Sequence, residues 1–212
     1  MGLPILVIGK SGVGKSTALR NFNQNEIGVV NVLGKPLPFK SNIKSIETDD
    51  YGKIKQVLLS SKVETLVIDD AGYLITNQFM RGHSGGKGSN IFDLYNQMGD
   101  DFWGLIRFIV DQLPPEKIVY LMMHEDKNEY GDIKPKTIGK MLDDKVCVEG
   151  MFTIVFRAIK YDGKHMFKTQ SDGFDVSKTP MGMFETDMIE NDLKVIDTTI
   201  RKFYNLGGNK NA

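Results

Sequence analysis

The nine residues from Gly9 to Thr17 have the types and spacing of a loop that binds phosphate. They match the pattern Gly-x-x-x-x-Gly-Lys-Ser through Gly9, Gly14, Lys15 and Ser16. In such a loop the backbone amides turn inward toward phosphate, and the absence of side chains at Gly12 and Gly14 leaves room for that turn. Lys15 offers a point charge to the β- and γ-phosphates, and the Ser16 hydroxyl suits Mg²⁺. We therefore expect ATP and Mg²⁺ as ligands, with nucleotide contacts from Ser11, Gly12, Val13, Gly14, Lys15, Ser16 and Thr17.

Two acids, Asp69 and Asp70, end the apolar segment that begins at Thr65. Mg²⁺ keeps most of its waters and needs a nearby carboxylate, which an acid at the end of a neighbouring apolar strand supplies. Asp69 directly ends the apolar run and is the predicted metal partner, through water. Asp70 is a candidate to orient or deprotonate an attacking water, or alternatively belongs to a turn before Ala71.

A third polar group, His124-Glu125-Asp126, follows the apolar run Ile118 to Met123. Ligands of parallel α/β sheets bind at the carboxyl ends of the strands. His124 is therefore a candidate sensor of the γ-phosphate, with a structural histidine as the alternative.

Parallel strands joined by helices would bring these three groups together. Short apolar runs at Leu3 to Ile8, Ile27 to Leu33, Thr65 to Asp70 and Ile118 to Met123 predict buried strands. Apolar spacing after Lys15 predicts a helix to about Asn23, whose free amides and dipole would add to the loop. Apolar residues at steps of three and four from Ile91 to Leu113 predict one long helix or two stacked helices.

The last third of the chain changes character. Asp162-Gly163 is a strong hairpin signal between strand-like segments at Met151 to Lys160 and His165 to Gln170. Apolar spacing from Ile189 to Phe203 predicts a closing helix that Gly207 ends. The expected fold is one α/β domain over residues 1–212: a mostly parallel sheet flanked by helices, with a late antiparallel hairpin and a C-terminal helix.

Composition limits the partners. Lysine plus arginine and aspartate plus glutamate both number 27, so no global field draws the chain to nucleic acid. The sequence contains neither a run of roughly 18 apolar residues nor a signal-peptide pattern, so we expect a soluble cytoplasmic protein that does not bind membranes. The single cysteine, Cys147, cannot form an internal disulfide and lies in a segment that is typical of a strand.

Together these motifs resemble the small RecA-like ATPases encoded by tailed phages. The resemblance rests on the loop Gly9 to Thr17, the strand ending in Asp69-Asp70, the pair His124-Glu125, and the late hairpin followed by Asp175 to Phe184. It implies a RecA-type core and ATP hydrolysis coupled to single-stranded DNA in recombination, annealing or replication. It also implies oligomerisation or phage replication proteins as partners, in the host cytoplasm.

The chain departs from the family pattern at the catalytic glutamate. In RecA-type recombinases this residue follows the strand after the phosphate-loop helix, whereas here that strand ends in Leu33-Gly34-Lys35-Pro36. Asp70 and Glu125 are therefore the candidate bases. RecA-like enzymes also complete a neighbour's site with a basic residue from a late hairpin, and Lys168 and Lys178 match that region.

The glycine-rich stretch from Met80 to Asn90 is predicted to be a mobile loop that closes on a phosphate backbone. Arg81 and Lys87 would supply its charge, and Phe79 would stack on a base. A connector without a ligand explains the same stretch equally well.

Two other functions fit the phosphate loop. A nucleotide or nucleoside kinase needs a lid with several arginines, whereas this chain has five arginines and no two are close in sequence. A nucleotide-gated binding module with little turnover is the second alternative, which the missing glutamate favours.

Overall fold

The structure, a computed structural model, describes residues 1–83, 89–138 and 146–207. Its strands are β1 (Leu3–Gly9), β2 (Ile27–Asn31), β3 (Ser45–Glu47), β4 (Thr65–Asp69), β5 (Ile118–Lys127), β6 (Ile133–Pro135), β7 (Val155–Tyr161), β8 (Lys164–Lys168) and β9 (Met188–Glu190). Its helices are α1 (Tyr51–Ser60), α2 (Gly72–Gly82), α3 (Ser89–Gln112) and α5 (Leu193–Phe203), with 3₁₀ turns η1 (Ser16–Leu19) and η3 (Glu149–Met151).

One mixed sheet organises the chain, in the order β3-β2-β4-β5-β1-β7-β8-β9, with β6 paired to β5. The six strands from β3 to β7 in this order run parallel, while β8 and β9 are antiparallel additions. β1 and β4 are buried along nearly their whole length because helices cover both faces of the sheet. The predicted α/β fold with a mostly parallel sheet is confirmed.

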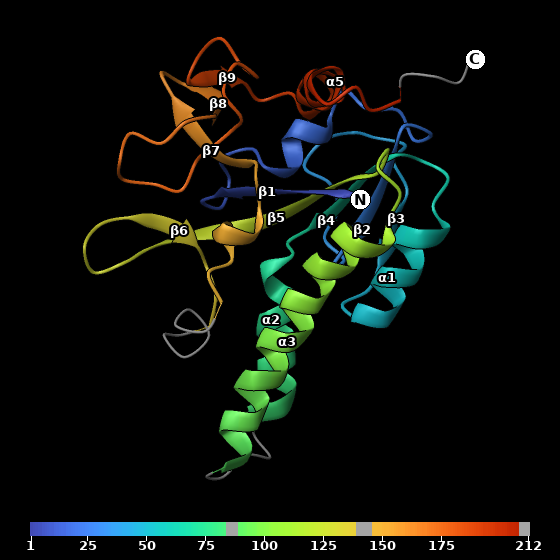
Figure 1. Ribbon diagram of the computed structural model, residues 1–212, viewed down its shortest axis with the longest axis vertical. Coiled ribbons are helices and arrows are strands. Elements are labelled where there is room, and N and C mark those ends of the chain that lie inside the picture. Colours follow the sequence, from blue (N-terminus) through green and yellow to red (C-terminus); the bar gives the residue numbers. More distant parts are fainter. Residues whose placement is uncertain (84–88, 139–145, 208–212) are drawn as a thin grey trace.

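Two apolar cores lie on opposite faces of the sheet. One is formed with α1, α2 and α3, and the other with η1 and α5 (Figure 1). α5 is fixed to the sheet through Asp197, which accepts hydrogen bonds from Tyr120 Oη (2.9 Å) and Thr65 Oγ1 (3.0 Å). The predicted closing helix is therefore part of the layer that covers one face of the sheet, where it is bonded to β4 and β5.

The late hairpin forms as predicted. β7 pairs antiparallel with β8, and the two turn residues Asp162 and Gly163 have φ of 47° and 74°. Positive φ at both central positions is the geometry that a tight hairpin requires, and Asp-Gly tolerates it.

Several predicted boundaries are wrong. The helix after the loop does not reach Asn23: η1 has four residues and ends at Leu19, because the asparagine-rich segment that follows favours turns. A long helix dipole is therefore absent from the described loop. β2 ends at Asn31 rather than Leu33. Cys147 is exposed and lies outside the described strands, just before η3.

The structure also contains helices and strand extensions that the sequence did not predict. β5 continues through His124 and Glu125 to Lys127, because β6 pairs with its extension. The single helix α3 replaces the alternative of two stacked helices. α1 was not predicted, although Asp50 caps its first turn by accepting from Lys53 N, and Ile54 and Leu58 form its buried stripe. None of the described helices has the length and apolar character needed to cross a bilayer.

Candidate functional site

The loop after β1 holds two glycines in conformations that other residues rarely adopt. Gly12 has φ of 77° and Gly14 has φ of 100°. A Cβ on Gly12 would meet nothing within 4 Å, so its backbone angle, rather than space, requires glycine there. A Cβ on Gly14 would lie 3.1 Å from Nδ1 of His165. Among the protein's own atoms, space therefore limits a side chain at Gly14 only, while the backbone angle favours glycine at both positions.

Lys15 folds back onto its own loop. Its Nζ donates to the carbonyl oxygens of Gly9 (2.8 Å) and Lys10 (3.0 Å), and the residue is only 6% exposed. Burial lowers the pKa of Lys15, while the nearby carboxylates of Asp70, Asp69 and Glu125 raise it. A buried ammonium group held by carbonyl oxygens would strongly attract an anion that enters the loop.

Ser16 and Asp69 meet although 53 positions separate them in sequence. Ser16 Oγ donates to Asp69 Oδ1 at 3.1 Å, and Asp70 N donates to the same oxygen at 3.0 Å. Burial raises the pKa of Asp69, and the hydrogen bond from Ser16 opposes that rise. A hydroxyl and a carboxylate side by side are the oxygen ligands that Mg²⁺ takes, with phosphates and water completing its shell. The residues predicted for the metal therefore fit it.

Asp70 has a strained backbone and two basic side chains, Lys35 and His124, beside its carboxylate. Its φ is 58°, its Oδ2 lies 2.6 Å from Lys35 Nζ, and its Oδ1 lies 3.6 Å from His124 Nε2. The ring of His124 also meets Tyr73 edge-on, with centroids 5.9 Å apart. Burial, reinforced by the charge of Lys15, lowers the pKa of His124, so its imidazole is neutral near pH 7. Asp70 and His124 thus come together as the sequence predicted.

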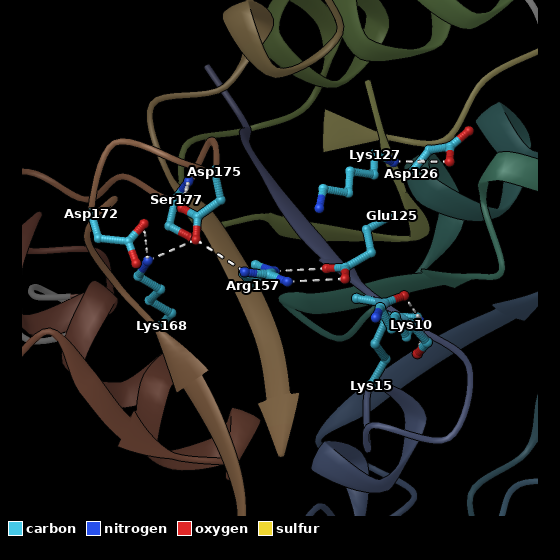
Figure 2. Close-up of polar contacts among 11 residues, drawn as sticks. Lys10, Lys15, Glu125, Asp126, Lys127, Arg157, Lys168, Asp172, Asp175 and Ser177 are labelled. Atoms are coloured by element: carbon cyan, nitrogen blue, oxygen red, sulfur yellow. Dashed lines mark hydrogen bonds and ion pairs between the residues drawn. The ribbon is translucent and has the colours of Figure 1, made fainter. Parts of the chain in front are cut away.

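Glu125, the other candidate base, is held by an arginine. Its two carboxylate oxygens accept from Arg157 Nε (2.8 Å) and Nη2 (3.1 Å), and its side chain is 3% exposed. Glu125 lies on β5 and Arg157 on β7, the two strands that flank β1, so the pair spans the end of β1 where the loop begins (Figure 2). A bidentate partner occupies the lone pairs that a general base needs.

The same arginine extends a chain of charges toward the late hairpin. Arg157 Nη1 lies 3.3 Å from Asp175 Oδ2, and Lys168 Nζ lies 2.8 Å from both Asp175 Oδ2 and Asp172 Oδ1 (Figure 2). Lys168, a predicted trans-acting residue, is therefore engaged within its own chain. Lys178 is half-buried, and its backbone pairs with that of Val155.

Removing Arg157 should destabilise the fold strongly. The Arg157→Ala variant leaves Glu125 and the fully buried side chain of Asp175 without their arginine partner, so we expect a loss of about 3 kcal/mol of unfolding free energy. Urea denaturation measures the change. Arg107→Ala is the control, since its exposed pair with Asp111 contributes less than about 0.5 kcal/mol. Equal urea midpoints for the two variants would show that the ion pairs of Arg157 do not stabilise the fold.

The residues predicted to contact DNA are placed differently from expectation. Met80 to Gly82 form the last turn of α2, so the predicted loop does not begin there. Phe79 packs on the core and stacks on His83, with ring centroids 5.0 Å apart. Arg81 Nη1 lies 2.6 Å from Asp49 Oδ2, and Lys87 lies outside the described residues.

Sequence reasoning missed several residues around the loop. His165 contacts the loop itself, with Nδ1 donating to Val13 O at 2.8 Å, whereas Arg157 binds Glu125 and Lys35 binds Asp70 beside it. The strand register also aligns Glu47 of β3 with Asn31 of β2, and Asn31 with Asp69. An acid is therefore present where these strands end, but it comes from β3, whereas the family pattern places the catalytic glutamate after β2. Only the strand-ending position of Glu47 offered a signal in the sequence.

Comparison of the chain with protein-family models and with curated proteins finds no match.

Proposed function

We propose that this chain binds ATP with Mg²⁺ at Gly9 to Thr17 and hydrolyses it. The observation that carries the proposal is the 3.1 Å contact of Ser16 Oγ with Asp69 Oδ1, directly after a glycine loop with a buried lysine. Strand β5 lies between β1 and β4, so this contact requires the loop to reach across a strand toward the acid. The resemblance to phage RecA-like ATPases agrees with the same ligands.

Each residue then has a defined task. Lys15 exchanges the carbonyl oxygens of Gly9 and Lys10 for the β- and γ-phosphate oxygens, which carry more charge. Ser16 and Asp69 would hold Mg²⁺, which would supply positive charge against that of the phosphates. Asp70 orients the attacking water and takes its proton, with His124 beside it.

Replacing Asp70 by asparagine should separate binding from hydrolysis. Asparagine tolerates the positive φ at this position, so the fold is retained while the carboxylate is lost. We expect unchanged ATP affinity and a hydrolysis rate about 100-fold lower. Phosphate release measures the rate, with the exposed Asp126→Asn as the control. A normal rate in the Asp70 variant would remove Asp70 from the mechanism.

A nucleotide-gated binding module with little turnover is the second candidate. It is favoured by the engagement of both candidate bases, Asp70 with Lys35 and Glu125 with Arg157. A kinase is disfavoured because every arginine has a carboxylate partner on its own chain, which leaves no cluster for a lid: Arg20 with Glu190, Arg81 with Asp49, Arg107 with Asp111, Arg157 with Glu125 and Arg201 with Asp197.

Phosphate release from ATP distinguishes these functions. The assay is run with Mg²⁺ or a chelator, with and without single-stranded DNA, and with added nucleosides. Mg²⁺-dependent release supports hydrolysis, and stimulation of that release by single-stranded DNA supports a role in recombination, annealing or replication. Binding without release supports the module, and a phosphorylated nucleoside supports the kinase.

A further inference from the structure

A cavity of about 620 Å³ opens beside the last residue of the phosphate loop. Thr17 and Arg20 form one wall, the hairpin residues Gly163 to Met166 form another, and Glu190 and Asn191 close it. In Figure 1 the strands β7, β8 and β9 extend the sheet beside η1, on the side of the molecule where α5 packs. The cavity thus joins segments from both ends of the chain.

A hydrogen bond from a residue that lines the cavity links it to the phosphate loop. His165, which lines it, donates from Nδ1 to Val13 O at 2.8 Å and packs against Gly14. Under the proposed function Lys15 and Ser16 would contact the β- and γ-phosphates and the metal, so the remainder of the nucleotide would leave the loop beyond them. Thr17 is the next residue, and the cavity begins at Thr17.

Asn191 lines this cavity and carries a buried amide without a partner among the described residues. The residue is 1% exposed, and neither its Nδ2 nor its Oδ1 has a hydrogen-bond partner within residues 1–83, 89–138 and 146–207. Buried polar groups nearly always have partners, so an orphaned donor and acceptor on one side chain call for a ligand. Arg20 Nη1 donates to the Asn191 carbonyl oxygen, and Asp192 caps α5, so the backbone here is fixed.

The chemistry of the amide selects the ligand. A carboxamide presents one acceptor and two donors in one plane. An asparagine pairs with adenine through the exocyclic amino group, which donates, and the neighbouring ring nitrogen, which accepts. Purine itself lacks the amino group and offers only the ring acceptor.

We propose that this cavity holds the ribose and base of the nucleotide and that Asn191 selects adenine. The proposal rests on the proposed function, since it takes the phosphates to lie at Gly9 to Thr17. It makes Asn191 a specificity-determining residue rather than a catalytic one.

The test compares three ligands in the presence of Mg²⁺: ATP, purine riboside triphosphate and inorganic tripolyphosphate. The wild-type chain should bind ATP about tenfold more tightly than purine riboside triphosphate. Asn191→Leu, which keeps the volume, should remove that difference and leave tripolyphosphate affinity unchanged. Gln78→Leu is the matched control, because Gln78 Oε1 is also an unpartnered buried amide oxygen among the described residues but belongs to α2.

The outcomes separate this proposal from the proposed function. If tripolyphosphate binds but ATP binds no better than purine riboside triphosphate, the base cavity is wrong and the phosphate loop stands. If Asn191→Leu keeps the wild-type ratio of the two affinities, Asn191 does not read the base. If the wild-type chain binds none of the three ligands, both proposals fail. The comparison of ligands on the wild-type chain needs no variant, so it decides even if Asn191→Leu does not fold.

Discussion

Lys15→Ala is expected to lower ATP affinity by at least about 100-fold and to abolish hydrolysis. The lysine would make two charge-assisted hydrogen bonds to phosphate oxygens, each contributing about 1.5–3 kcal/mol, and 1.4 kcal/mol corresponds to a factor of about ten. Calorimetric titration with ATP and Mg²⁺ measures the affinity, and phosphate release measures the rate.

Lys53→Ala is the charge-matched control, since Lys53 lies on the exposed side of α1. It should bind ATP as the wild type does. The fold of the Lys15 variant should remain intact, because Gly9 and Lys10 lose only a side-chain donor. Equal affinities for the Lys15 variant and the wild type would mean that the loop does not bind the phosphates.

Asp69→Asn should remove Mg²⁺-dependent turnover and lower the hydrolysis rate by at least about 100-fold. The reason is that replacing the carboxylate by a neutral amide takes several kcal/mol of stabilisation from the bound metal. The substitution is geometrically conservative. Both hydrogen bonds, from Ser16 Oγ and Asp70 N, go to Oδ1, which asparagine also has. Phosphate release measured across a range of Mg²⁺ concentrations tests this, with Asp111→Asn on the surface as the control. Unchanged Mg²⁺ dependence would exclude Asp69 as the metal partner.

The same variant should be more stable than the wild type in the absence of metal. Burial raises the pKa of Asp69 in the folded chain, so the wild type loses stability as the pH rises through that folded pKa. Asparagine resembles the protonated acid and does not titrate. The gap in Tm should therefore be small near pH 4 and grow toward pH 7, which thermal unfolding in a chelator measures. A lower Tm for the variant at pH 7 would contradict the burial of an unfavourable charge.

Local patterns predicted the parts of the site that depend on one segment. The glycines and Lys15 of the loop, the acids that end β4 and the Asp162-Gly163 turn each follow from short-range chemistry. Their meeting followed from the rule that parallel strands place their carboxyl ends at one edge. The contact of Ser16 with Asp69 was predictable for that reason.

The order of the strands was not predictable from these patterns. Glu125 looked like a free acid at a strand end, but β5 and β7 flank β1, so Arg157 reaches it across the loop. His165 meets Val13 only because the late hairpin extends the sheet on the β1 side. Phe79 belongs to a helix that packs on the core. The glycines that follow it in the sequence suggested a loop instead.

The most direct test is calorimetric titration of the wild-type chain with a non-hydrolysable ATP analogue and, separately, with AMP. The site built from Lys15, Ser16 and Asp69 acts on the terminal phosphates. We predict one site per chain, an affinity for the triphosphate at least about 100-fold greater than for AMP, and loss of most of that difference when Mg²⁺ is chelated. Equal affinities for the two ligands, or no effect of removing Mg²⁺, would contradict the proposed triphosphate site.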